Sequence, residues 1–407
     1  LDRAYADAMR KVWQAHPDDA DVGAFFAEAL MDLRPWNQWT PDGKPQPGTE
    51  EVVATLEAVL KLDLQHPLAN HLTIHALEAS PYPERAVAAA DRLRDLQPGL
   101  AHNVHMPSHI DIRNGRWHES IVANTKAIAA SERFRALAGP ATGPLLIYNA
   151  HNRHMLAYSA MMTGQQKLAI DHIQKMVSEL PEDFVKDFAP FVDAYVAMPY
   201  EVLLRFGRWD DVLAAGDHPE YLPFSRAIRH AARGVAFAAK NDTAAAKAEQ
   251  TAYLAAAKLV PPEEMSGPVK VQTILAVATP MLDGEILYRE GKVDEGLARL
   301  REAVQAEDAL GYIEPPAWFL PVRHSLGASL MNAQRYEEAE QVYRADLKRL
   351  PDNGWSLFGL AESLRAQRRS GDARSIAAHF QEIWTSADTP ITSSCMCQPG
   401  APVALAE

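Results

Sequence analysis

Apolar residues recur along this 407-residue chain with the three-to-four-residue period of an amphipathic helix. Segments rich in strong helix formers, such as 86–96 and 244–259, alternate with short polar turns. The 28 prolines fall mainly between these segments, where they end helices. Signals for β-strands are nearly absent. The pattern therefore predicts an all-α protein made of many short helices.

The segment 324–351 carries a more specific spacing, formed by Leu326, Gly327, Tyr336, Ala339, Tyr343 and Pro351. This spacing resembles the 34-residue tetratricopeptide (TPR) repeat, a helix-turn-helix unit with small residues where its helices cross and a proline after the second helix. Further units fit upstream, starting at Pro67, at Ala101 and near Ala150. Degenerate units are marked by Gly207, Asn241 and Gly291.

The resemblance to TPR proteins covers nearly the whole chain and is most specific over 67–134 and 320–386. It implies a right-handed α-superhelix whose first helices line a concave groove, and a role as a protein-interaction scaffold. Segments 71–86 and 102–117 also resemble those of a group of bacterial TPR-repeat proteins with histidine-rich repeats.

The same 34-residue repeat spacing divides the chain into five parts. We expect N-terminal helices in 1–66, histidine-rich repeats in 67–185, degenerate repeats in 186–319, C-terminal repeats in 320–386 and a flexible tail in 387–407. A Trp- and Pro-rich loop at 35–49 interrupts the first part. Its tryptophans, Trp36 and Trp39, either cover a helix end or form an aromatic lid over the groove.

Histidines follow the 34-residue register. The pairs His71/His75 and His105/His109 are each spaced i,i+4, and the two pairs lie one repeat apart. Counting by repeat position, eight of the 15 histidines fall at three positions that face the groove in a TPR protein. These eight are His71, His75, His102, His105, His109, His151, His154 and His324.

Histidine pairs on adjacent helices converge as metal ligands, so we interpret the cluster as a metal site, with room for two ions. Imidazole ligands suit copper and zinc, and copper is preferred because it binds imidazole most tightly. Asn70, Asn103, Asn149 and Glu78 are candidates to orient the rings. Tyr148, Tyr158, Arg153, Trp36 and Trp39 are candidates to contact a substrate.

Two functions remain open. The protein is either a metal-dependent enzyme, an oxidoreductase with copper or a hydrolase with zinc, or a scaffold that binds a peptide or protein in its groove. The H-E-x-x-H protease motif, the P-loop, the G-x-G-x-x-G loop and the G-x-S-x-G elbow are all missing from the sequence. Elemental analysis would separate the two functions.

Charge and composition exclude other classes. The net charge of −13 argues against a nucleic-acid-binding surface, and no apolar run is long enough to span a membrane. The two cysteines, Cys395 and Cys397, cannot make a disulfide framework, and their C-x-C spacing in a flexible tail is a weak soft-metal signal. We expect a cytoplasmic protein or, alternatively, a periplasmic or secreted one whose leader has been removed.

Overall fold

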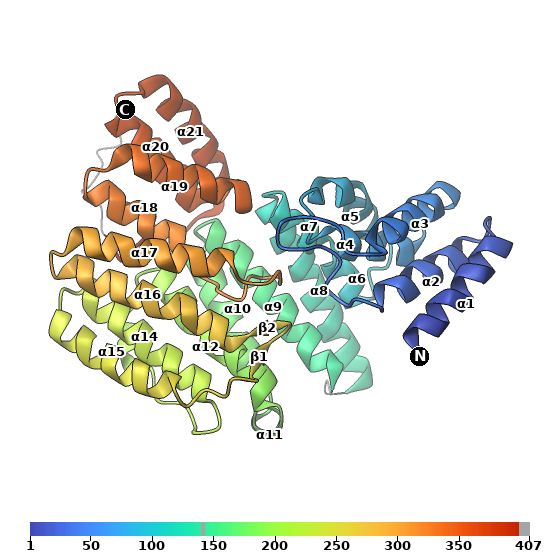
Figure 1. Ribbon diagram of the computed structural model, residues 1–407, viewed down its shortest axis with the longest axis horizontal. Coiled ribbons are helices and arrows are strands. Elements are labelled where there is room, and N and C mark those ends of the chain that lie inside the picture. Colours follow the sequence, from blue (N-terminus) through green and yellow to red (C-terminus); the bar gives the residue numbers. More distant parts are fainter. Residues whose placement is uncertain (140–142, 399–407) are drawn as a thin grey trace. The chain divides into compact units, whose positions relative to one another are not determined.

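The computed structural model describes residues 1–139 and 143–398 and is all-α, as the sequence predicts (Figure 1). The chain divides into two compact units, Leu1–Met155 and Leu156–Glu407, and this division falls within helix α9. It does not coincide with the boundaries at 66, 185, 319 and 386 that the repeat spacing suggests. We describe each unit by itself.

The helices that begin in unit 1 are α1 (Asp2–Ala15), α2 (Ala20–Met31), α3 (Thr49–Leu62), α4 (Pro67–Leu77), η1 (Pro83–Ala86), α5 (Val87–Leu93), α6 (Ala101–His105), α7 (Pro107–Arg113), α8 (Trp117–Ala138) and α9 (Pro144–Met162).

Those of unit 2 are α10 (Gln166–Ser178), α11 (Glu182–Asp187), α12 (Ala189–Arg205), α13 (Trp209–Ala214), α14 (Pro223–Ala239), α15 (Thr243–Ala257), α16 (Val271–Arg289), α17 (Val293–Asp308), α18 (Val322–Asn332), α19 (Tyr336–Arg349), α20 (Gly354–Ala366), α21 (Ser370–Ile383) and η2 (Trp384–Ser386). Strand β1 (Met265–Ser266) pairs with β2 (Val269–Lys270) in an antiparallel hairpin, which the sequence pattern does not predict.

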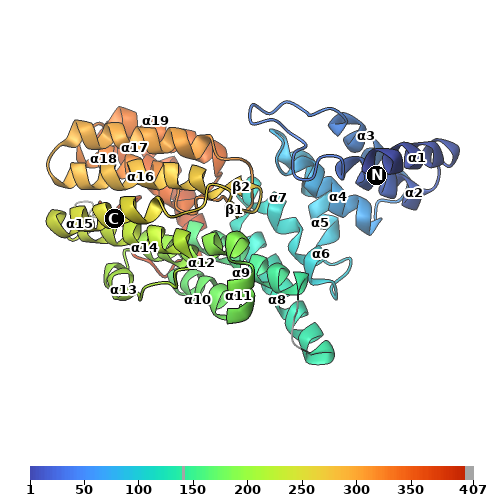
Figure 2. The same ribbon diagram turned by 60° about the horizontal axis from the view of Figure 1, so that its bottom comes forward.

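Successive helices form the antiparallel pairs of TPR-like repeats. Within unit 2, α14 packs against α15 and α16 against α17, and the two pairs lie one above the other (Figure 2). The turn between the helices of a pair contains a residue with positive φ, as at Gly115, Gly207, Asn241 and Gly291. These are residues that mark the repeats in the sequence, so the predicted repeats are confirmed at their turns.

Small residues lie where helices cross, as the repeat pattern requires. Gly327 of α18 and Gly359 of α20 both face the ring of Tyr343 in α19, and a Cβ on either glycine would overlap that ring. Tyr343 is buried in a large core formed by apolar residues of helices α12 to α21.

Among the described residues of unit 1, one smaller apolar core is formed by α1 to α4 and another by α4, α5 and α7. The loop 35–49 precedes α3, and Trp39 packs against the second of these cores. Trp39 also donates a hydrogen bond from its indole nitrogen to the carbonyl of Ala76, at 2.7 Å. This tryptophan therefore covers the C-terminal end of α4.

The C-terminal segment differs from the expectation of a flexible tail. Residues 393–395, 397 and 398 are buried within unit 2. Cys395 and Cys397 are joined by a disulfide. Apolar contacts with Ala328 and Trp209 help to hold these cysteines. The rest of the predicted tail, 399–407, lies outside the described residues.

None of the helices in the described ranges is long and apolar enough to cross a membrane.

Candidate metal centre

Histidines reach the centre of unit 1 from α4, from α6 and α7, and from α9. Helix α4 begins at Pro67, whose nitrogen carries no hydrogen and needs no acceptor. His66 caps the helix, because its Nδ1 accepts a hydrogen bond from the backbone N–H of Ala69 at 3.2 Å. Helices α6 and α7 follow each other through Met106, which is itself helical with φ −49° and ψ −39°. The i,i+4 pairs predicted on these helices therefore each share one helical face.

Six of the eight predicted histidines form two groups of three. In each group the nearest ring nitrogens all lie within 4.8 Å of one another. The first triad is His71, His75 and His102, and the second triad is His105, His109 and His151. Ring centroids within the triads are as close as 4.9 Å for His71 and His75 and 4.6 Å for His105 and His151. The triads are neighbours, since the rings of His75 and His109 are 5.8 Å apart.

Four of the six imidazoles have their Nδ1 atom against an oxygen of another side chain. The pairs are His71 with Asn103 Oδ1 at 2.9 Å, His75 with Glu78 Oε1 at 3.1 Å, His105 with Asn124 Oδ1 at 2.7 Å, and His109 with Glu78 Oε2 at 2.8 Å. An Nδ1–H that donates to such an oxygen leaves Nε2 as a free lone pair, which is the tautomer that binds a metal ion.

The amide orientations that fix these tautomers are themselves determined by hydrogen bonds. Asn124 donates from Nδ2 to the Ser120 carbonyl at 2.9 Å, and Asn103 donates from Nδ2 to Gln97 Oε1. Each amide therefore presents its oxygen, not its nitrogen, to a histidine. The proton of His105 consequently lies on Nδ1.

The second triad contains a conflict that a cation would resolve. The Nε2 atoms of His105 and His109 are 2.8 Å apart, although the Nδ1 atoms of both rings face acceptor oxygens. Two lone pairs at this distance repel unless a positive ion or a proton lies between them. Zinc–nitrogen bonds of about 2.0–2.1 Å at a tetrahedral angle need the two nitrogens about 3.3 Å apart, so a small side-chain movement would admit an ion.

Protonation is an unfavourable way to resolve this conflict. His105 is completely buried, and burial followed by the charges of His151 and His109 lowers its pKa well below the usual range. Burial likewise lowers the pKa of His71 to about 4 and that of His102 to about 3, and neighbouring imidazoles add to the effect. Burial therefore favours the neutral, ligating form of these three rings.

The carboxylate of Glu78 contacts both triads. Burial by itself raises the pKa of Glu78, but His75 and His109 outweigh it and hold the pKa well below its usual range. Glu78 follows directly after α4, four residues from Ile74, whose carbonyl accepts its backbone N–H. It therefore carries negative charge into the buried histidine cluster.

Two predicted ligands lie outside the triads. His154 is buried on α9, with its ring 6.4 Å from that of His151. His324 lies in unit 2, where its Nδ1 accepts from Arg205 at 2.6 Å and its Nε2 faces Asp346 at 3.0 Å. Both nitrogens of His324 thus have hydrogen-bond partners within unit 2, and its role as a metal ligand stays a prediction.

Most of the predicted substrate contacts are placed elsewhere. Trp36 is 72% exposed and Trp39 is bonded to the end of α4, so the aromatic lid is not formed. Arg153 is buried and lies 3.6 Å from Glu132. Tyr158 belongs to unit 2, where its ring packs on that of Phe319. Only Tyr148, 4.8 Å from the ring of His102 and partly exposed, lies beside a triad.

Among the predicted orienting groups, Asn103 and Glu78 contact imidazole rings of the triads, whereas the amide nitrogen of Asn70 is used at the start of α4. Asn70 donates to the carbonyls of Leu64 and His66 and so stabilises the start of α4. Asn149 is buried on α9. Asn124, which orients His105, is not identified by the sequence analysis. The sequence feature that could have indicated it is its i,i+4 spacing from Ser120, a second polar residue on the buried face of α8.

The donor set is all nitrogen within each triad, which suits copper or zinc and disfavours magnesium or calcium. Three protein ligands leave coordination positions open, as catalytic sites require. The arrangement is thus suited to bind one or two transition-metal ions.

Comparisons with known proteins extend the description of the fold only. No protein-family model and no curated protein sequence matches the chain. Among solved structures, yeast Tom70 is similar at 14% identity and a TM-score of 0.33, over 94% of this chain and 89% of that one. Cut9–Hcn1 of the APC/C is similar at 10% identity and a TM-score of 0.30, over 95% and 91%.

The TPR domain of P58(IPK) is similar at 12% identity and a TM-score of 0.24, over 89% of this chain and 93% of that chain. At these TM-scores the likeness carries no further argument. The repeat architecture rests on the helix pairs, turns and crossing points described above.

Proposed function

We propose that unit 1 binds transition-metal ions at the two histidine triads, one ion in each, and that this is the chemical function of the protein. The observation that carries the proposal is the orientation of the rings. Four imidazoles are turned by oxygen acceptors so that Nε2 is available, and two of these Nε2 atoms are directed at each other at 2.8 Å. A cluster serving only for packing has no reason to hold two lone pairs in opposition.

Copper remains the preferred ion and zinc the second choice, because all-imidazole sites bind copper(II) most tightly in the divalent series. Copper would supply oxidation by O₂ and zinc would supply hydrolysis. The residues themselves would bind and orient: Asn103, Asn124 and Glu78 fix the rings, and Tyr148 lies where a substrate of the first triad would enter.

Metal uptake by the full chain, purified without a polyhistidine tag, tests the proposal. We expect two equivalents of Cu²⁺ or Zn²⁺ by elemental analysis after dialysis, falling to one in the His105→Gln/His109→Gln variant. Binding should also raise the stability of unit 1, by about 2.7 kcal/mol at a free metal concentration 100 times the Kd. The matched control is His16→Gln/His118→Gln, which removes two exposed histidines of the same unit.

The control should keep both equivalents and the full gain in stability. A protein that takes up no transition metal, or a triad variant that binds as much as the control, would overturn the proposal.

A scaffold role is the second candidate function, favoured by the TPR-like repeats and by one observation in unit 2. There, the chain's own segment 394–398 lies against helices of the repeats, with the carbonyls of Ser394 and Cys397 held by Arg205 and Arg289. Helix faces of these repeats thus bind the backbone of a non-helical segment. A folded protein without metal uptake would make this the better description.

A further inference from the structure

We propose a further metal site, in unit 2, that opens only when the Cys395–Cys397 disulfide is reduced. Its ligands are the two freed thiolates and the carboxylate of Glu285, and it would take a thiophilic divalent ion such as Zn²⁺. This site is separate in residues and in chemistry from the histidine triads and does not rest on them.

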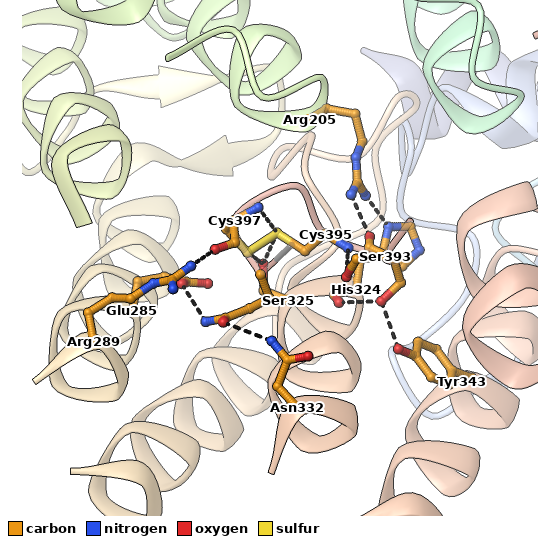
Figure 3. Close-up of a disulfide and its surroundings, with 12 residues drawn as sticks. Arg205, Glu285, Arg289, His324, Ser325, Asn332, Tyr343, Ser393, Cys395 and Cys397 are labelled. Atoms are coloured by element: carbon orange, nitrogen blue, oxygen red, sulfur yellow. Dashed lines mark hydrogen bonds between the residues drawn. A yellow bond between two sulfur atoms is a disulfide. The ribbon is translucent and has the colours of Figure 1, made fainter. Parts of the chain in front are cut away.

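The three groups already lie together in a buried place. Cys395 is 3% exposed, Cys397 2% and Glu285 1%, and one sulfur or oxygen atom from each lies within 4.8 Å of the others. Figure 3 shows the disulfide passing over Ser325 of α18, with Glu285 of α16 beside it. Among the described residues, Oε1 of Glu285 has no hydrogen-bond partner.

The positions of the cysteines do not depend on the disulfide alone. Arg205 donates to the carbonyl of Ser394, and Arg289 donates to the carbonyl of Cys397 (Figure 3). The hydroxyl of Ser394 is 2.7 Å from that of Tyr343, and it donates to the carbonyl of His324 at 2.9 Å.

The last described residue is held as well. Gln398 accepts from Asn332 at 3.3 Å and donates to Glu285 Oε2 at 3.4 Å. Bonds on both sides of the C-x-C segment thus keep the two sulfurs beside Glu285 after the bond between them is cut.

The donor chemistry fits zinc. Zinc accepts cysteine sulfur and glutamate oxygen in a tetrahedral site, and three protein ligands leave the fourth position for water. The guanidinium groups of Arg289 and Arg205 contact the backbone of the segment and bring positive charge near it, which favours thiolates over thiols. The C-x-C motif, a weak signal in the sequence, gains here the rigid and electropositive setting that the sequence does not reveal.

The reaction balances with a dithiol reductant as the co-reactant. One dithiol gives two electrons and two protons to the disulfide and becomes a disulfide itself, so Cys395 and Cys397 become two thiols. A divalent ion then displaces both thiol protons to solvent as it binds the two sulfurs. In the oxidised state the sulfurs are bonded to each other and the site is closed.

Cobalt(II), used alone as a spectroscopic substitute for zinc, tests this proposal on the full chain under anaerobic conditions. Thiolate ligands give Co²⁺ a near-ultraviolet charge-transfer band that histidine ligands do not give. We expect protein reduced with dithiothreitol and then desalted to develop this band with one equivalent of Co²⁺, and oxidised protein to show none. Binding at the histidine triads would leave the band unaffected, so the two proposals fail independently.

Variants define the site. Cys397→Ser should abolish the band, and Glu285→Gln should weaken Co²⁺ affinity about tenfold or more, because loss of a ligand costs at least as much as loss of a group that orients one. Thr392→Ala, at an exposed position of the same segment, is the matched control and should retain the band. Thermal unfolding of each reduced variant verifies that it is folded. A reduced protein without the band, or a band that Glu285→Gln leaves equally tight, would overturn the proposal.

Discussion

Asn124 illustrates how a single side chain sets the chemistry of an imidazole. Its oxygen lies 2.7 Å from Nδ1 of His105, and its amide nitrogen is held by the carbonyl of Ser120. Asn124→Leu removes the acceptor that orients His105, so we expect the second triad to lose about 10- to 100-fold in metal affinity. Asn124→Asp keeps an oxygen and should retain most of the affinity. Competition titration against a chromophoric chelator measures both, with the first triad as internal reference.

Equal affinities for Asn124→Leu and the unaltered protein would show that this contact does not orient the ligand.

At the scale of single residues, the sequence predicts the candidate metal-ligating histidines better than it predicts the residues that orient them. The i,i+4 spacing and the repeat period are enough to place His71, His75, His105 and His109 together, because both follow from helix geometry. His324 shows the limit of the register: it occupies the same repeat position, yet in unit 2 its neighbours are Arg205 and Asp346, and no count along the chain reveals those neighbours.

The packing of whole helices depends on very small residues at the crossing points. Gly327 faces the ring of Tyr343, so Gly327→Ala forces α18 and α19 apart or distorts the ring. We expect a loss of about 1–3 kcal/mol in the free energy of unfolding, measured by urea denaturation. Gly371→Ala, in α21 with open space around it, is the matched control and should be neutral or stabilising by up to about 1 kcal/mol.

If Gly327→Ala and Gly371→Ala had the same free energy of unfolding, the helix crossing at Gly327 would not require a small residue.

Helices and turns are predictable from the sequence because each repeat marks its turn and its crossing with characteristic residues, as at Gly207 and Gly327. The hairpin of β1 and β2 is not predictable in the same way. Each strand has only two residues, which is too short for an alternating pattern to show. Likewise, the sequence leaves open whether Trp39 covers a helix end or forms an aromatic lid, and its packing at the end of α4 is not visible in the sequence.

On the scale of the molecule, buried carboxyl groups give unit 2 a marked dependence on pH. Glu201 of α12 is buried and accepts the backbone N–H groups of Phe319 and Leu320 at 2.8 and 2.9 Å. Burial raises its pKa to about 8 from an ordinary value of 4.5, and these two hydrogen bonds only partly oppose the rise. At pH values between about 4.5 and about 8, the Glu201 carboxyl therefore takes up a proton when the protein folds. The free energy of unfolding falls as the pH rises through this range.

Glu201→Gln keeps an acceptor for both N–H groups and removes the titration. The fall in stability between pH 5 and pH 8 should then be shallower by up to about 1.4 kcal/mol per pH unit, measured by urea unfolding at several pH values. Parallel stability curves for the variant and the unaltered protein would contradict this.

The division into two units and the docking of the C-terminal segment could not be predicted from the sequence. The repeat spacing is a local property of the sequence. It continues through α9 without any sign that the boundary between the two compact units falls within that helix. The polar composition of residues 387–398 indicates a flexible segment, yet Ser394 and Cys397 are held by arginines that are more than a hundred residues away in the chain. Long-range partners of this kind leave no periodic trace.

Glu78 has a consequence for the thermodynamics of loading. One oxygen of its carboxylate contacts His75 of the first triad, and the other contacts His109 of the second. If the triads bind ions as we propose, an ion at either triad would act on this shared anion and so change the binding energy at the other. The two binding events are therefore linked equilibria with a single coupling free energy, which by reciprocity has the same size whichever ion arrives first.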